Sequence, residues 1–145
     1  MRHLTRLFVR LGYVFAAVVA ALYWGGQDRL LDCPPPKGAT RATLADTPPA
    51  LRQSLQEEIG EMAAPGEKFD ATEAINTGRN RRLAFIWNEG RRWVVATEKG
   101  GTLYSDPVFA YDLAPDGGRA VLMERRIAMP DTLCQIAGEL LTTAR

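Results

Sequence analysis

The feature that most constrains the fold is a stretch in the middle of the chain, NRRLAFIWNEGRRWVVATE, which spans residues 80–98. Each half of it is a short, mostly apolar run with aromatic and β-branched residues, as in β-strands. The triplet NEG at residues 88–90 is typical of a turn with glycine in the left-handed conformation. If this triplet forms a three-residue loop, Phe85 lies opposite Trp93. The sequence therefore predicts a β-hairpin.

Neither face of this hairpin is polar, although one face of an antiparallel sheet is often solvated. We therefore expect both faces to be covered, by this chain or by a partner. A proline in a later strand cannot donate a ladder hydrogen bond, so that strand is expected to be an edge, bulged or broken. The candidate interaction surface is one face of the hairpin or the edge near the proline: Ala84, Ile86, Val94, Ala96 and Pro107.

Helical periodicity flanks the strand patterns, because apolar residues recur every three to four positions in residues 48–62 and again in residues 130–141. The predicted fold class is α+β: an N-terminal transmembrane or signal helix, then a helix, a roughly five-stranded antiparallel meander and a C-terminal helix. We expect the last two helices to pack on one face of the sheet, with the second face closed by curling or by a partner. The expected strands are residues 69–76, 81–87, 91–98, 102–113 and 119–128.

An uncharged segment, residues 11–27, follows a basic flank at residues 1–10. A basic flank stays on the cytoplasmic side of a membrane, so the rest of the chain is expected on the outer, periplasmic or extracellular side. As a helix the segment is roughly 26 Å long, slightly less than the roughly 30 Å apolar core of a bilayer. This length is compatible with a single-pass anchor in the cytoplasmic membrane and with a cleaved signal peptide. Tyr23 and Trp24 lie where an interfacial aromatic belt would, which favours the anchor.

Residues 28–46 contain three consecutive prolines and are typical of a semi-rigid tether. Residues 47–145 are then the exported domain, long enough for one modest core. The chain has only two cysteines, Cys33 and Cys134. Two cysteines in an oxidising compartment are expected to pair, so we predict a disulfide that closes a loop of roughly 100 residues.

The single histidine of the chain, His3, lies in the basic flank. Its position excludes histidine bases, Ser-His-Asp and Cys-His nucleophiles and most zinc sites from the exported domain. No phosphate-binding loop is recognisable either, so we expect no catalytic residue, no metal and no cofactor. Four carboxylates lie near strand aromatics, but the sequence does not place any two of them across a cleft: Glu98, Asp106, Asp112 and Glu124.

The net charge of the chain is +1, and the basic excess belongs to the N-terminal segment, which argues against nucleic acid as a partner. We expect a non-enzymatic, membrane-tethered exported domain that acts as a protein-interaction module or accessory subunit of a cell-envelope assembly. An inhibitor or immunity protein belongs to the same class. The expected partners are another envelope or membrane protein and, through residues 11–27, the lipid bilayer.

Two alternatives come from other functional classes. The first is a periplasmic domain that binds a small apolar ligand in a cavity rimmed by Trp87, Trp93 and Tyr104. A ligand that shifts the tryptophan fluorescence would support it. The second is a carboxylate-based hydrolase, for which Glu98 and Asp106 are the candidate residues. Their replacement by the corresponding amides would then abolish its activity.

Overall fold

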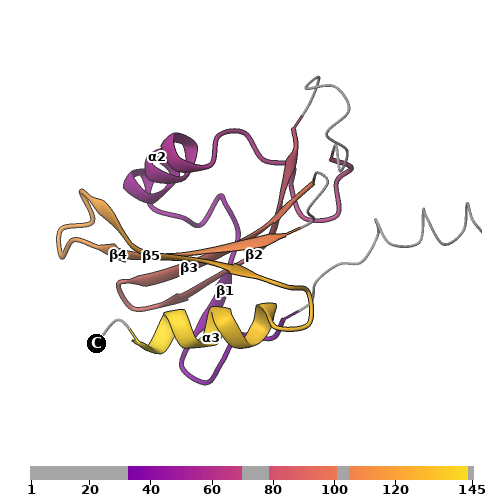
Figure 1. The fold of residues 1–145 in the computed structure, drawn as a ribbon. Helices are drawn as coiled ribbons and strands as arrows, with labels where there is room; N and C mark the ends of the chain where they lie inside the picture. The colour runs from indigo at the N-terminus through magenta and orange to yellow at the C-terminus, as the bar shows by residue number, and fades with distance from the viewer. Residues whose placement is uncertain (1–32, 70–78, 101–104, 144–145) are drawn as a thin grey trace, which may run out of the picture.

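Five antiparallel strands and two helices make up the described part of the chain, an α+β arrangement as the sequence predicts (Figure 1). This computed structural model describes residues 33–69, 79–100 and 105–143. The strands pair in the order in which they follow one another along the chain. The elements are β1 (Thr40–Ala42), α2 (Pro49–Glu58), β2 (Arg81–Glu89), β3 (Arg92–Lys99), β4 (Asp106–Leu113), β5 (Ala120–Ala128) and α3 (Leu133–Thr143).

Two expected elements fall outside these residues. The membrane or signal helix at residues 11–27 is one, and the strand expected at residues 69–76 is the other, apart from its first residue. Neither helix of the described ranges is long and apolar enough to cross a bilayer. The remaining four expected strands correspond to β2, β3, β4 and β5.

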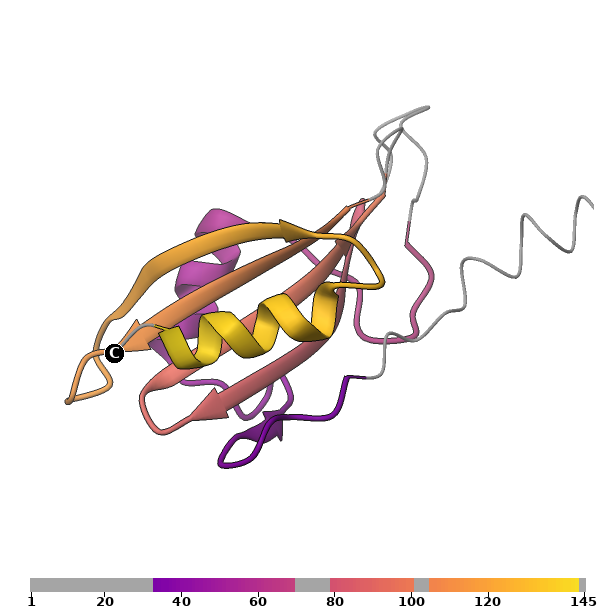
Figure 2. The ribbon, with the colours of Figure 1, turned by 60° about the horizontal axis from the view of Figure 1, so that its bottom comes forward.

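Each face of the sheet is covered by one helix, which corrects the expectation that both helices pack on the same face (Figures 1 and 2). Helix α2 starts with Pro49, where a missing backbone N–H costs nothing, and buries Leu51 and Leu55 against one face, called here the α2 face. Helix α3 buries Leu133 and Leu140 against the opposite, α3 face. Apolar side chains on both faces of the central hairpin are thus covered from within the chain.

Strand β1 lies within the segment that the sequence assigns to the tether. Thr40–Ala42 pair antiparallel with residues 86–88 of β2, so the folded domain begins before residue 47. Three residues are too few to show a two-residue periodicity, and the prolines before them favour a reading as spacer. The described sheet therefore includes part of the segment that was expected to be a tether.

The β2–β3 hairpin has a shorter turn than predicted. Glu89 pairs with Arg92, so the turn has two residues, and Gly90 takes the positive φ of +61° that such a turn needs at its first position. Phe85 consequently lies opposite Ala96, which corrects its expected pairing with Trp93. In the same register Ile86 lies opposite Val95 and Val94 lies opposite Trp87, which places Ile86 and Val94 on opposite faces of the sheet. Further along β2, a bulge between Leu83 and Phe85 shifts the alternation again.

Strand β4 is an inner strand between β3 and β5, so the expectation that Pro107 marks an edge is wrong. The β3–β4 pairing runs from Arg92 to Ala96, and Pro107 lies just beyond it. The Thr97 hydroxyl donates a hydrogen bond of 3.3 Å to the Pro107 carbonyl there. The bulge of this strand pair falls elsewhere, next to Ala110, where β5 carries one extra residue.

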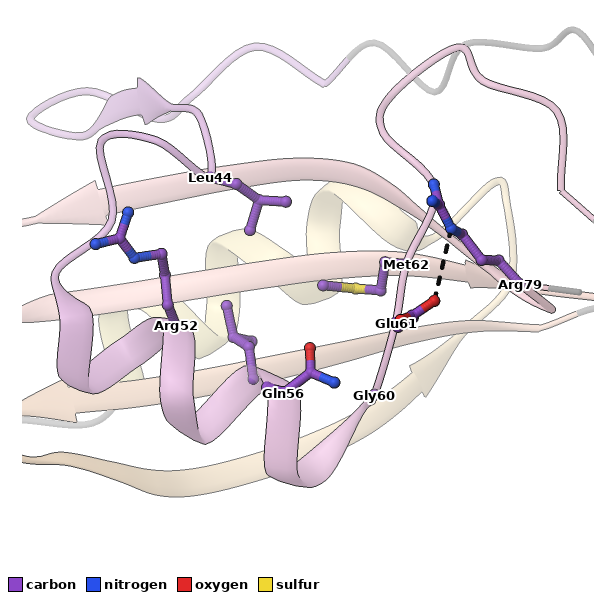
Figure 3. Close-up of a pocket in the computed structure, with 8 residues that line it drawn as sticks. Leu44, Arg52, Gln56, Gly60, Glu61, Met62 and Arg79 are labelled. Carbon is purple, nitrogen blue, oxygen red and sulfur yellow. Dashed lines mark ion pairs between the residues drawn. The ribbon is translucent and has the colours of Figure 1, made fainter.

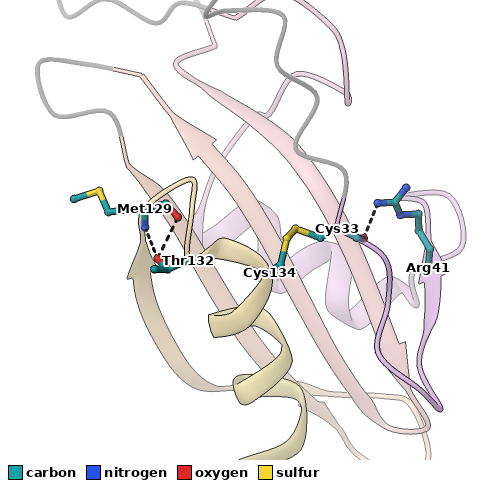
Figure 4. Close-up of a disulfide and its surroundings, with 5 residues drawn as sticks. All are labelled: Cys33, Arg41, Met129, Thr132 and Cys134. Atoms are coloured by element: carbon teal, nitrogen blue, oxygen red, sulfur yellow. Dashed lines mark hydrogen bonds between the residues drawn. A yellow bond between two sulfur atoms is a disulfide. The ribbon is translucent and has the colours of Figure 1, made fainter.

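The predicted disulfide is present between Cys33 and Cys134, whose Cα atoms are 5.4 Å apart (Figure 4). It joins the first described residue to the first turn of α3 across 101 residues of sequence. Two local hydrogen bonds hold its surroundings: Arg41 Nη2 donates to the Cys33 carbonyl over 3.0 Å, and the backbone N–H of Met129 donates to the Thr132 hydroxyl over 3.1 Å. The disulfide therefore fastens the start of the described domain to helix α3.

Candidate functional site

The residues of the expected interaction surface lie inside the domain. Ile86, Val94 and Ala96 have no exposed surface, Pro107 is also buried, and Ala84 is half-buried in the bulge of β2. The helices of the chain cover these residues, Val94 and Ala96 beneath α3 and Ile86 beneath α2. The hairpin face is thus part of the core, which corrects its reading as a surface for a partner.

The expected ligand rim of tryptophans is not formed either. Trp87 packs on the α3 face, where its ring stacks on Phe85 with centroids 4.5 Å apart. Trp93 packs on the α2 face, and both tryptophans are at most 5% exposed. Tyr104, the third member, lies outside the described residues. The two indole rings belong to two separate hydrophobic cores, one on each face of the sheet, and do not line one cavity.

The candidate carboxylates are buried or held in ion pairs. Glu98, 2% exposed, accepts hydrogen bonds of 3.2 and 2.7 Å from Nε and Nη2 of Arg82, which is equally buried. Asp106 has no exposed surface, and neither of its oxygens has a hydrogen-bond partner among the described residues. Burial, with a smaller contribution from the Glu98 charge, raises the pKa of Asp106 to about 7. Asp112 pairs with Arg91, outside this cluster.

The raised pKa of Asp106 would suit an acid–base site, but its carboxyl group is not accessible to a substrate. A glycosidase carboxylate pair faces a substrate across a cleft. Glu98 and Asp106 are enclosed, and neither lines the hollows described below. Within the described ranges, no three His, Cys, Asp or Glu side chains gather in a way that could hold a metal.

The exposed large apolar side chains of the described residues are concentrated on β5 and the residue after it. Their exposed fractions range from 36% to 62%. Strand β5 is also an outer strand of the sheet, with nine residues, whereas β1 at the other edge has three. An outer strand carries unpaired backbone N–H and C=O groups along one side. We call the exposed set the β5 edge patch: Val121, Leu122, Met123, Ile127 and Met129.

Charged side chains in the middle of β5 divide this patch into two apolar ends. Each of these charged side chains is paired within the chain. On the α2 face, Arg125 lies 5.4 Å over the Phe109 ring and 3.7 Å from Glu58 of α2. On the α3 face, Arg126 pairs with Glu139 of α3 at 3.1 Å and with Glu124 at 2.7 Å. The two arginine side chains contact the two helices, so they do not cover the apolar residues at either end of the patch.

An apolar groove opens at the other side of the sheet, where the outer edge of β2 is only partly covered. β1 pairs with β2 as far as Ile86, and Ala63 bridges to Arg82 further on. The space between them holds a groove of about 640 Å³. It includes two residues of the predicted interaction surface, and its lining is mostly apolar: Arg41, Ala42, Thr43, Leu44, Ala45, Ala64, Pro65, Leu83, Ala84, Phe85 and Ile86.

A smaller hollow of about 310 Å³ adjoins the C-terminal end of α2 and shares Leu44 with the groove (Figure 3). Arg52 and Arg79 lie at its two ends, and Glu61 pairs with Arg79 over 3.9 Å. Arg79 is half exposed and also pairs with Glu67 at 3.5 Å, so its charge is balanced by solvated carboxylates. No buried polar group converges on this hollow among the residues that line it.

Sequence reasoning missed the β5 edge patch, although a signal for it exists. The last strand of a meander is an outer strand, and the sequence RAVLMERRIA places apolar residues on both sides of its charges. Comparison with known proteins adds no assignment: no family model, no curated protein and no solved structure matches the chain.

Proposed function

We propose that this chain is a non-enzymatic, membrane-tethered protein-interaction domain on the outer side of the cytoplasmic membrane, and that it binds its partner along β5. The observation that carries the proposal is the β5 edge patch. Four large apolar side chains stand exposed on a nine-residue outer strand and a fifth, Met129, directly follows it, while both faces of the sheet are covered by the chain's own helices. The partner that fits this edge is an extended segment that pairs as a sixth strand.

Two kinds of interaction would stabilise such a complex. Backbone hydrogen bonds to the free side of β5 give affinity, as in other cases where a peptide extends a sheet. Apolar side chains of the partner would cover the two ends of the patch, and full burial of one such side chain contributes about 1.5 to 3 kcal/mol. The charged middle of the strand would then determine the register of the added segment.

The N-terminal part of the chain suits an accessory role. The basic flank and residues 11–27 are expected to anchor the chain, and the disulfide fastens the start of the described domain to α3. An anchor restricts the domain to the membrane surface, which raises its effective concentration near other membrane-bound proteins. A modest affinity along β5 is sufficient under these conditions.

The test uses the full-length protein in its host, with a photo-reactive residue in place of Met123. We expect a cross-linked product of defined mass after illumination. Leu122→Asp, which places a carboxylate beside the probe, should abolish this product. The matched control Gln53→Asp, on the exposed side of α2, should leave it unchanged. Equal cross-linking in both variants, or none in the parent, would refute docking along β5.

A second candidate function, binding of a small apolar ligand, is favoured by the groove of about 640 Å³ beside β2. Its volume and lining are typical of sites for small apolar molecules. A solvatochromic apolar dye should bind the full-length protein in membranes, and Ala45→Trp at the rim should reduce its fluorescence. Gln53→Trp adds the same side chain away from the groove and is the control. If neither substitution changes the fluorescence of the bound dye, this function is excluded.

A further inference from the structure

We infer that the first partner of β5 is a second copy of this chain, paired antiparallel through β5 of each copy. This inference rests on the proposed function, because it uses the same edge and names its occupant. The sequence of the strand, AVLMERRIA from Ala120 to Ala128, is the basis of the argument. It places an apolar group at each end and a charged group, Glu-Arg-Arg, in the middle.

Side-chain direction along β5 follows from its partners in β4. Arg125 lies opposite Phe109 and on the α2 face, where it pairs with Glu58. Glu124 and Arg126 are neighbours on the α3 face, since they contact each other and Arg126 reaches Glu139 of α3. The two opposite charges of the α3 face therefore flank Arg125 symmetrically, one residue before it and one after it.

An antiparallel pair of identical strands has a two-fold axis, and here the axis passes beside Arg125. Glu124 of each copy then lies opposite Arg126 of the other, and this contact occurs twice. Opposite charges at directly facing positions stabilise a strand pair, whereas like charges destabilise it. The order of charge along β5 thus has the complementarity that self-pairing requires.

The same register brings the apolar ends together. Beyond Glu124 the bulge at Met123 shifts the pairing by one residue, so Leu122 of one copy lies alongside Ile127 of the other, and both ends of each patch are covered. At the axis the two Arg125 side chains face each other. Each is already paired with Glu58 of its own helix and lies over its own Phe109 ring, which limits the repulsion between them. The result is one continuous ten-stranded sheet.

Cysteine cross-linking tests this geometry in the full-length protein in its host membrane. Arg125→Cys places one thiol from each copy at the axis, and the two native cysteines are already bonded to each other. Mild oxidation should give a product of twice the chain mass. The control Arg119→Cys, exposed at the start of the same hairpin arm, should not cross-link. In the proposed pairing its two copies lie roughly 40 Å apart, at about 3.3 Å per residue.

Charge reversal tests the register on the Arg125→Cys background. Glu124→Arg and Arg126→Glu each place like charges opposite each other, and each should reduce the cross-linked product at least fivefold. The double exchange restores opposite charges and should recover it. The double variant is compared with Arg126→Glu alone, because both have lost the ion pair with Glu139.

The outcomes separate this inference from the proposed function. A dimer at Arg125→Cys that responds to charge reversal as described supports the second copy as partner. If no dimer forms but the photo-reactive residue at Met123 still gives a product sensitive to Leu122→Asp, the docking edge stands and the second copy is excluded. If neither experiment gives a cross-linked product, both proposals are refuted.

Discussion

Asp106 should make the stability of this domain fall as the pH rises from about 4 to about 7. Its side chain has no exposed surface, and burial together with the Glu98 charge raises its pKa from 3.8 to about 7. Below pH 4 this carboxyl is protonated in both the folded and the unfolded chain. Between pH 4 and 7 the unfolded chain releases the proton and the folded chain keeps it, so unfolding becomes easier. Above pH 7 both forms are ionised and the effect levels off.

The size of this effect follows from the shift in pKa. One pKa unit corresponds to about 1.4 kcal/mol, so the shift of Asp106 lowers the free energy of unfolding by up to about 4 kcal/mol between pH 4 and 8. Asp106→Asn removes the ionisable group and keeps its shape. The variant should therefore match the parent near pH 4 and exceed it in stability at pH 8.

Urea unfolding of the full-length protein in mild detergent, followed by the fluorescence of the buried tryptophans, measures this difference across pH 4 to 9. Asp131→Asn, at an exposed position, is the control and should follow the parent curve. Other titrating groups contribute equally to parent and variant, so the difference between their curves isolates Asp106. Parallel curves for the parent and Asp106→Asn would refute the reasoning, because they would show that this carboxyl does not change its protonation on unfolding.

Further substitutions test the packing, the buried ion pair and the cross-link by urea unfolding at neutral pH. Cys33→Ser with Cys134→Ser opens a loop of 101 residues and should cost about 4 to 5 kcal/mol, and reduction of the parent protein should cost the same. Glu98→Gln leaves the buried Arg82 charge without the carboxylate that pairs with it and should cost about 3 to 5 kcal/mol, with a smaller loss if Arg82→Met is added. Leu51→Ala, at a site with no exposure, should cost about 2 to 5 kcal/mol, and a loss below 1 kcal/mol would contradict the packing of α2.

Strands β2 to β5 and both helices of the described domain could be predicted from periodicity, because each has several apolar repeats. Strand β1 could not, since three residues carry no repeat. The turn between β2 and β3 was misplaced because Asn88 and Glu89, which the sequence suggests as loop residues, are the last two residues of β2, and the turn consists of residues 90 and 91. That shift, with the bulge at Ala84, redistributes the side chains of the hairpin between the two faces.

The candidate site was harder to predict than the fold. The sequence shows that both hairpin faces are apolar, but it does not show which helix covers which face. The exposure of a strand depends on that tertiary arrangement. One hairpin face was therefore read as a surface, namely Ala84, Ile86, Val94 and Ala96. In the structure each face lies beneath a helix of the same chain. Strand β5 was read as a routine last strand, and its exposure became evident only when the order of the strands was known.

Outer strands often carry charges and bulges that prevent association with other chains, and β5 has both. What distinguishes β5 from a protected edge is where its charges point. Arg125 reaches Glu58 on one face and Arg126 reaches Glu139 on the other, so neither stands over the open side of the strand as an unpaired charge. The bulge lies at Met123, which is itself apolar and 54% exposed. The opposite edge is short, and its strand β1 begins with the polar residues Thr40 and Arg41. A domain that avoided association at both edges would not leave its exposed apolar side chains on the longer one.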